Sequence, residues 1–163
     1  MTPTATFNEL AERYRPELLA YMIRLLGDVH DAEDACQDAL LRAYRAYARL
    51  TPGSNVRAWL YKIATNTAFN ALKRRGRIAS RTADEDLEQL AAESDATFAL
   101  RERLRAIAQA VEALPPKQRA ALMLRQFHGL SYAEIAASIG GNAASARANV
   151  YVAVHKIRQA LAD

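Results

Sequence analysis

Residues 55–77 read NVRAWLYKIATNTAFNALKRRGR, a run without proline that follows the turn residues Thr51-Pro52-Gly53. Ser54 or Asn55 can accept a hydrogen bond from a backbone N–H at the start of a helix, so the run predicts one long helix. This helix contains no acidic residue, and its cations are Arg57, Lys62, Lys73, Arg74, Arg75 and Arg77. The expected fold is built outward from this basic helix.

The composition of the whole chain favours helix almost throughout. Of its 163 residues, 6 are glycine and 5 are proline, alanine is abundant, and β-branched residues are scattered. An apolar share of 51% argues against wholesale disorder. The expected fold class is therefore all-α, and the length allows one medium domain or two small ones.

The segments before the basic helix predict two further helices. Thr6 or Thr4 can cap a first helix, which Gly27 ends, and Pro16 is expected to open a fresh helical turn within that stretch. A second helix is expected from about residue 28 to about residue 50. Its acidic residues come in its first half, where they suit the helix dipole, and they are Asp28, Asp31, Glu33, Asp34 and Asp38.

The segments after the basic helix predict a linker and four helices. Residues 79–95 are acidic with little apolar periodicity, which is typical of a flexible linker. Helices are then expected over about 96–114, 117–128, 131–140 and 142–161, with prolines or glycines between them. The last two, joined by Gly140-Gly141, are typical of a helix-turn-helix.

The last helix has a buried stripe and an outward face. The stripe consists of Ala146, Val150, Ala153, Ile157 and Leu161, and the outward residues are Arg147, Tyr151, His155 and Arg158. That face either enters a major groove of DNA or is an ordinary solvated face. Asn142 and Ser145, near the helix start, either contact phosphates and bases or only cap the helix.

The basic helix combines aromatic residues with cations. Aromatic rings stack on unpaired bases while cations follow phosphates, which is the chemistry of holding a melted DNA strand. The alternative is that Trp59, Ile63 and Phe69 belong to the core and that the basic tail complements the C-terminus of a helix. For Trp59 itself the core is the favoured interpretation, whereas the basic run favours an anionic partner.

Several functional classes find no support in the sequence. A single cysteine, Cys36, and three widely spaced histidines, His30, His128 and His155, argue against a metal site. No Ser/His/Asp constellation or glycine-rich phosphate loop is present, so neither an enzyme, nor a cofactor, nor a small-molecule substrate is expected. No leader or membrane segment is recognisable, and the expectation is a cytoplasmic protein without membrane insertion.

Three segments in order resemble a known family. They are HDAEDACQDALLRAYR at 30–45, the basic helix at 55–77, and LPPKQRAALMLRQFHGLSYAEIAASIG at 114–140. They look like regions 2.2, 2.3 to 2.4 and 4 of a bacterial group-4, or extracytoplasmic-function (ECF), RNA polymerase sigma factor. The resemblance implies two small helical domains: region 2 at 1–78, a bundle of three to four helices, and region 4 at 96–163, a helix-turn-helix, with the linker at 79–95 between them.

The resemblance also implies a function and roles for residues. Such a protein binds core RNA polymerase and directs promoter recognition and melting. The residues that would face the clamp coiled coil of the β′ subunit are Asp34, Gln37, Asp38 and Arg42. The residues that would lie near the minus-ten element are Asn55, Trp59, Tyr61, Lys62, Asn66, Asn70, Lys73 and Arg74, and the loop 50–55 would capture a flipped base. The linker would occupy the RNA-exit path, and the free chain is expected to bind DNA weakly.

The recognition helix departs from the family pattern. The residues expected at the minus-thirty-five element are Ser145, Arg147, Asn149, Tyr151 and His155. Most cations of the family motif are missing, and Val152 and Val154 could extend an apolar surface for a protein. The alternative function is therefore a sigma-like adaptor or decoy that binds a regulatory protein without initiating transcription. An anti-sigma factor is a further expected partner, on the family resemblance alone.

Overall fold

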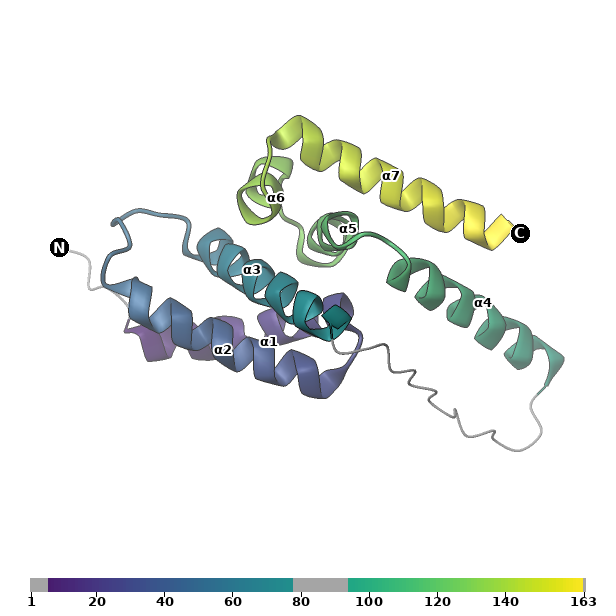
Figure 1. The fold of residues 1–163 in the computed structure, drawn as a ribbon, viewed down its shortest axis with the longest axis horizontal. Coiled ribbons are helices and arrows are strands. Elements are labelled where there is room, and N and C mark those ends of the chain that lie inside the picture. Colours follow the sequence, from purple (N-terminus) through teal and green to yellow (C-terminus); the bar gives the residue numbers. More distant parts are fainter. Residues whose placement is uncertain (1–5, 78–93, 163) are drawn as a thin grey trace.

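The computed structural model describes residues 6–77 and 94–162 of the chain, and within these ranges it contains seven α-helices and no strand (Figure 1). The helices are α1 Phe7–Leu26, α2 Val29–Tyr47, α3 Val56–Arg77, α4 Asp95–Glu112, α5 Pro116–His128, α6 Tyr132–Ile139 and α7 Ala143–Ala162. The expected all-α class is confirmed. Residues 79–93 of the expected linker lie outside the described residues.

Local sequence signals set the helix ends. Thr6 and Glu9 form a capping box at the start of α1, and Ser131 and Glu134 form another at the start of α6. Asn55 caps α3, because its Oδ1 accepts the N–H of Ala58 at 3.0 Å. Gly27 ends α1 with φ of 76°, in the left-handed region that glycine enters at no steric cost. The predicted caps Thr6, Asn55 and Gly27 are confirmed.

The expectation of a new helical turn at Pro16 is wrong, because α1 continues through this residue without a break. Proline lacks the N–H that would bond to the carbonyl of Glu12, one turn earlier. Both Pro16 and Glu12 are exposed, so water can satisfy that carbonyl. Beyond it, the buried residues Leu18, Tyr21 and Leu25 hold the rest of α1 in the core.

The first three helices form a bundle in which α2 packs closely against α1 and α3. The buried face of α2 consists of small residues only: Ala32, Ala35, Cys36, Ala39 and Ala43. Small side chains let helix backbones approach closely, which leaves the opposite, acidic face of α2 in solvent. The bundle therefore presents α2 as an outer helix.

The later helices form the predicted helix-turn-helix. The helix α7 packs on α4, α5 and α6, and its buried residues are Ala146, Val150 and Ala153. Ile157 is half-buried and Leu161 is 36% exposed, so the predicted stripe weakens toward the end of the helix. None of the described helices is long and apolar enough to cross a membrane.

The two groups of helices pack directly against each other. The helix α1 lies against α5, and α3 lies against α6, so that α5 and α6 are held between α3 and α7 (Figure 1). One apolar cluster continues across this junction, from Leu25 and Leu60 on one side to Leu124 and Ile135 on the other. No sequence pattern predicted this contact.

Arg119 of α5 binds the ends of two other helices, α1 and α4, at the junction. Its guanidinium donates to the carbonyls of Leu25 at 2.8 Å, Glu112 at 2.6 Å and Leu114 at 3.2 Å. These carbonyls lie at or just beyond the C-termini of α1 and α4, where helix carbonyls lack partners within the helix. A buried cation at two helix C-termini is also favoured by both dipoles.

The substitution Arg119→Ala should lower the free energy of unfolding by about 2–4 kcal/mol, because it removes the donor for three carbonyls, two of them in buried hydrogen bonds. Urea denaturation followed by circular dichroism measures the loss. The control is Arg103→Ala on the exposed side of α4, which should change stability by no more than about 0.5 kcal/mol. Equal effects of the two substitutions would contradict the role of Arg119.

Candidate nucleic-acid interface

One face of α3 carries an exposed polar stripe. Lys62, Asn66, Asn70 and Lys73 follow one another at intervals of three or four residues, and all four are exposed, as is the neighbouring Arg74. Cations at both ends and amides between them can contact phosphates and base edges along a strand. Five of the predicted minus-ten residues are thus brought together on one solvent-facing surface.

Trp59 extends this stripe toward the start of α3 but is half-buried against the core. Its ring centroid lies 6.3 Å from that of Tyr47, which in turn lies 5.6 Å from that of Phe7. The two interpretations of Trp59 therefore both hold in part. Its inner side packs in an aromatic cluster, while its outer side remains partly accessible.

Tyr61 lies on the opposite side of α3 and is completely buried. Its hydroxyl lies 2.8 Å from Nδ1 of His128 on α5, and burial raises the pKa of this phenol. The expectation that Tyr61 faces DNA therefore does not hold in this arrangement of the helices. The spacing along the helix indicates that Tyr61 is buried, since it shares a face with the buried Ala64 and Ala68 rather than with Lys62.

Two cations of the basic run are also engaged internally. Arg57 pairs with Glu17 through contacts of 3.1 and 3.2 Å, and it donates to the carbonyl of His128 at 2.6 Å. Arg75 donates to the carbonyl of Leu26 at 2.8 Å and pairs with Asp31. The charges of these two residues are thus met within the chain, and Arg75 fits the alternative that the basic tail complements the C-terminus of a helix.

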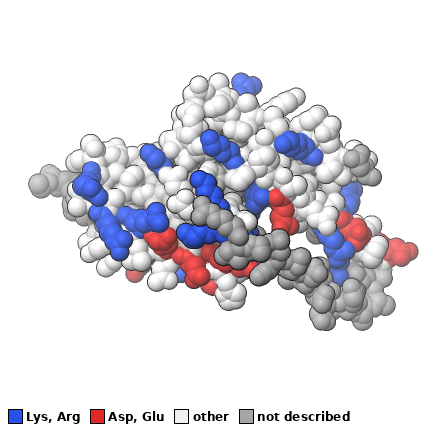
Figure 2. Space-filling view, viewed as in Figure 1, with Lys and Arg blue, Asp and Glu red and all other residues white. Residues whose placement is uncertain are grey.

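The outer face of α2 carries the predicted polymerase-facing residues. Asp34, Gln37 and Arg42 are exposed and Asp38 is half-buried, with Nε of Arg42 at 3.4 Å from Oδ1 of Asp38. Figure 2 shows acidic side chains gathered along the lower edge of the molecule, where α2 lies, and basic side chains above them.

Leu41 was missed by the sequence interpretation. It is 49% exposed and falls among Asp34, Gln37 and Asp38 on the helical wheel of α2. The sequence could have indicated this exposure, because Leu41 lies outside the stripe of alanines that α2 buries. An exposed apolar side chain ringed by polar ones is typical of the centre of a protein interface.

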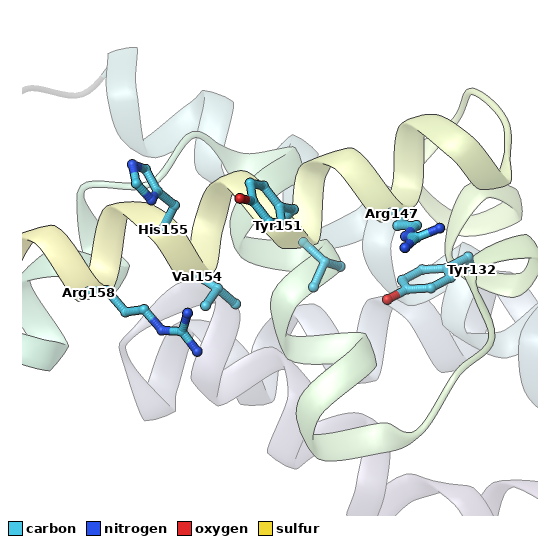
Figure 3. Close-up of a pocket in the computed structure, with 7 residues that line it drawn as sticks. Tyr132, Arg147, Tyr151, Val154, His155 and Arg158 are labelled. Carbon is cyan, nitrogen blue, oxygen red and sulfur yellow. The ribbon is translucent and has the colours of Figure 1, made fainter.

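A pocket runs along the outward face of α7 (Figure 3). It is lined by Tyr132 of α6 and by Arg147, Val150, Tyr151, Val154, His155 and Arg158 of α7. Three predicted minus-thirty-five residues, Arg147, Tyr151 and His155, therefore share one surface. The other two differ. Asn149 is half-buried. Ser145 takes part in capping α7: Oδ1 of Asn142 accepts the N–H of Ser145 at 2.8 Å, and Oγ of Ser145 accepts the N–H of Asn142 at 2.9 Å.

Comparison with known proteins shows the family to which the chain belongs. The model of Sigma-70 region 2 matches residues 10–78, and that of Sigma-70 region 4 matches residues 104–161. The ECF RNA polymerase sigma-E factor of Escherichia coli K12 is 33% identical over 158 residues, which cover 89% of this chain and 81% of that protein. The chain belongs to the ECF family of RNA polymerase sigma factors.

Other ECF sigma factors match across both regions. The SigE factor of Mycolicibacterium smegmatis is 34% identical over 161 residues, covering 97% of this chain, and the chain spans 61% of the length of that relative. A solved structure of the sigma factor RpoE in complex with the anti-sigma factor NepR, from Bartonella quintana, superposes with a TM-score of 0.75 at 25% identity. That superposition covers 95% of this chain and 96% of the other.

His128 lies at the junction between regions 2 and 4. Its ring is packed against Tyr21 and Tyr61, with centroid distances of 5.5 and 5.3 Å. Desolvation lowers its pKa to about 4, and the nearby Arg24 and Arg57 act in the same direction, against the opposing effect of Glu17. Nε2 is buried without a hydrogen-bond partner among the described residues, so a second proton on the ring would find no acceptor.

Acidification should therefore weaken the fold through His128. Unfolding restores the ordinary pKa of about 6.5, so between that pH and about pH 4 the unfolded chain binds a proton that the folded chain does not. The contribution of His128 to the free energy of unfolding is fully present above this window. It is lost as the pH falls through the window, by at most about 1.4 kcal/mol per pH unit. Chemical denaturation at several pH values measures the slope for the natural chain and for His128→Gln.

The difference between these two slopes gives the contribution of His128 alone to the pH dependence of stability, because the carboxylates are present in both proteins. His155→Gln provides the matched control, because His155 is exposed on α7 and the substitution should leave the slope unchanged. Parallel pH profiles for the natural chain and His128→Gln would contradict the assignment.

Proposed function

We propose that the chain binds core RNA polymerase and directs it to promoters as an initiation factor without catalytic activity of its own. The observation that carries this function is the separation of two exposed surfaces in region 2. The acidic face of α2 and the basic stripe of α3 belong to the same rigid bundle but present opposite charges. One surface suits a basic protein and the other suits DNA, as a factor that joins polymerase to promoter requires.

For polymerase docking we assign Asp34, Gln37, Asp38 and Arg42 to contact a basic coiled coil, with Leu41 at the centre. Charge attraction steers the encounter, and the apolar side chain contributes affinity once water is excluded.

For the minus-ten element we assign the stripe from Lys62 to Lys73, with Arg74, Trp59 and Asn55 at its ends. Tyr61 lies on the opposite side of α3, against Tyr21 and His128, and is not part of this surface. The domain limits 1–78 and 96–163 and a cytoplasmic location form part of the same proposal.

The pocket on α7 supports two candidate roles for region 4. Arg147, Tyr151 and His155 can contact bases or phosphates at a minus-thirty-five element, supported by Ser145 and Asn149. The apolar floor formed by Val150 and Val154 instead favours a protein ligand, as in the adaptor alternative. The match to RpoE in its complex with NepR supports an anti-sigma factor as the protein partner.

Reversing charge on α2 should abolish polymerase binding. In Asp34→Arg with Asp38→Arg, attraction to a basic coiled coil becomes repulsion, and capture of purified core polymerase at ordinary salt should fall below detection. Circular dichroism checks that the helices remain. Glu102→Arg on the exposed face of α4 is the control and should leave capture unchanged. Polymerase retained by the double variant would refute the docking face.

Removing two cations from α3 should separate docking from promoter melting. In Lys73→Ala with Arg74→Ala, polymerase capture should persist, while permanganate reactivity of unpaired promoter thymines should fall. The loss should shrink at low salt, where the remaining phosphate contacts are stronger. Undiminished thymine reactivity at physiological salt would show that this stripe does not hold the melted strand.

A further inference from the structure

The outer face of α7 has a hydrogen-bonding side and an apolar side. Arg147, Tyr151 and His155 lie along the pocket, where they can donate hydrogen bonds to base edges or phosphates. Val152 lies about 100° further round the helix than Tyr151, away from the pocket. Its side chain is 38% exposed and offers only methyl groups. The two sides of α7 therefore suit different groups on a binding partner.

The helical neighbours of Val152 reinforce its apolar character. Ala148, one turn before it, is exposed and has no polar atom in its side chain, and Asn149 is half-buried. Lys156, one turn after it, donates through Nζ to a glutamine side chain of α5 at 2.9 Å. His155 lies on the side of the pocket. A DNA edge that meets Val152 therefore meets methyl groups rather than a set of hydrogen-bond donors.

Val152 is also well placed along the helix. In the function proposed for region 4, α7 enters a major groove, and recognition helices contact base edges through their N-terminal residues. Val152 lies in the first half of α7, which begins at Ala143 and ends at Ala162. From Arg147 to Val152 the helix rises by about 7.5 Å, or about two base-pair steps of DNA. The two side chains can therefore contact different base pairs of one element.

Valine discriminates among base edges by its lack of polar atoms. Adenine, guanine and cytosine present hydrogen-bond donors and acceptors in the major groove, and contact with valine removes water from these groups without supplying a partner. Thymine adds a C5-methyl group, which gains free energy when it is buried against another apolar group. The edge that fits Val152 best is therefore that of thymine.

We propose that Val152 is a specificity-determining residue that recognises the C5-methyl group of a thymine in the upstream promoter element. Arg147 contacts a polar base edge, for which guanine is the common partner of arginine, about two base-pair steps away. The inference rests on the function proposed for region 4. It adds an apolar contact with one base to the hydrogen bonds that the pocket side of α7 can make.

Exchange of thymine for deoxyuridine tests this contact, because it removes the methyl group and keeps every hydrogen-bonding atom of the base. The chain bound to core polymerase first selects promoters from a library with a randomised upstream element. Each thymine of the selected element is then replaced in turn, and the affinity of the holoenzyme is measured. At one position the affinity should fall about fourfold, as expected for the burial of one methyl group.

Val152→Ala identifies the position that valine contacts. The substitution removes both γ-methyl groups, and alanine favours helix, so α7 should be retained, which circular dichroism checks. At the sensitive position this variant should bind thymine and deoxyuridine equally. Val29→Ala, which shortens an exposed valine on α2, is the matched control and should keep the fourfold ratio. The ratio should not depend on salt concentration, because a methyl contact carries no charge.

The contrary results differ in what they overturn. A loss on deoxyuridine exchange that is equal for the natural chain and Val152→Ala would overturn the contact, as would an element with no sensitive thymine. If Val152→Ala selects the same promoters with the same affinity, this face does not read DNA, and the protein partner of the adaptor alternative is favoured. A chain that fails to bind core polymerase, or a holoenzyme without preference in the upstream element, would refute the proposed function and this inference with it.

Discussion

The closed structure depends on reciprocal capping of helix ends across the junction. Arg57 of α3 binds the last carbonyl of α5, and Arg119 of α5 binds a carbonyl in the last turn of α1. Each region thus supplies a cation to the C-terminus of a helix of the other region. Such bonds have strict geometry, so they fix the position of region 4 on region 2 more sharply than the shared apolar cluster alone.

This constraint gives α3 two different sides. Its inner side carries Arg57, Tyr61, Ala64 and Ala68, which serve the core and the junction, and its outer side carries the exposed polar stripe. A helix buried on so wide an arc is rigid, which suits a surface that must hold an unstacked strand. The same arc places Tyr61 against Tyr21 of α1 and His128 of α5, on the side of α3 away from the polar stripe.

The sequence predicted every helix and most caps, because glycine, proline and capping residues act locally. It also placed Lys62, Asn66 and Asn70 correctly on an exposed surface of α3. It failed at Tyr61, Arg57 and Pro16, where the outcome depends on what packs nearby rather than on neighbours in sequence. Arg119 and His128 carried no signal at all, since a cation or an imidazole that serves distant carbonyls and hydroxyls has no sequence period.

The central claim is that regions 2 and 4, which pack against each other in this structure, lie far apart when the chain binds polymerase and promoter DNA. Spin labels at Arg13→Cys on α1 and Lys156→Cys on α7, in a Cys36→Ala background, report the distance between the regions directly. The account predicts a single short distance for the free chain and one longer by tens of ångströms with core polymerase and promoter DNA, as the spacing of the elements requires. The same short distance in both states would contradict it.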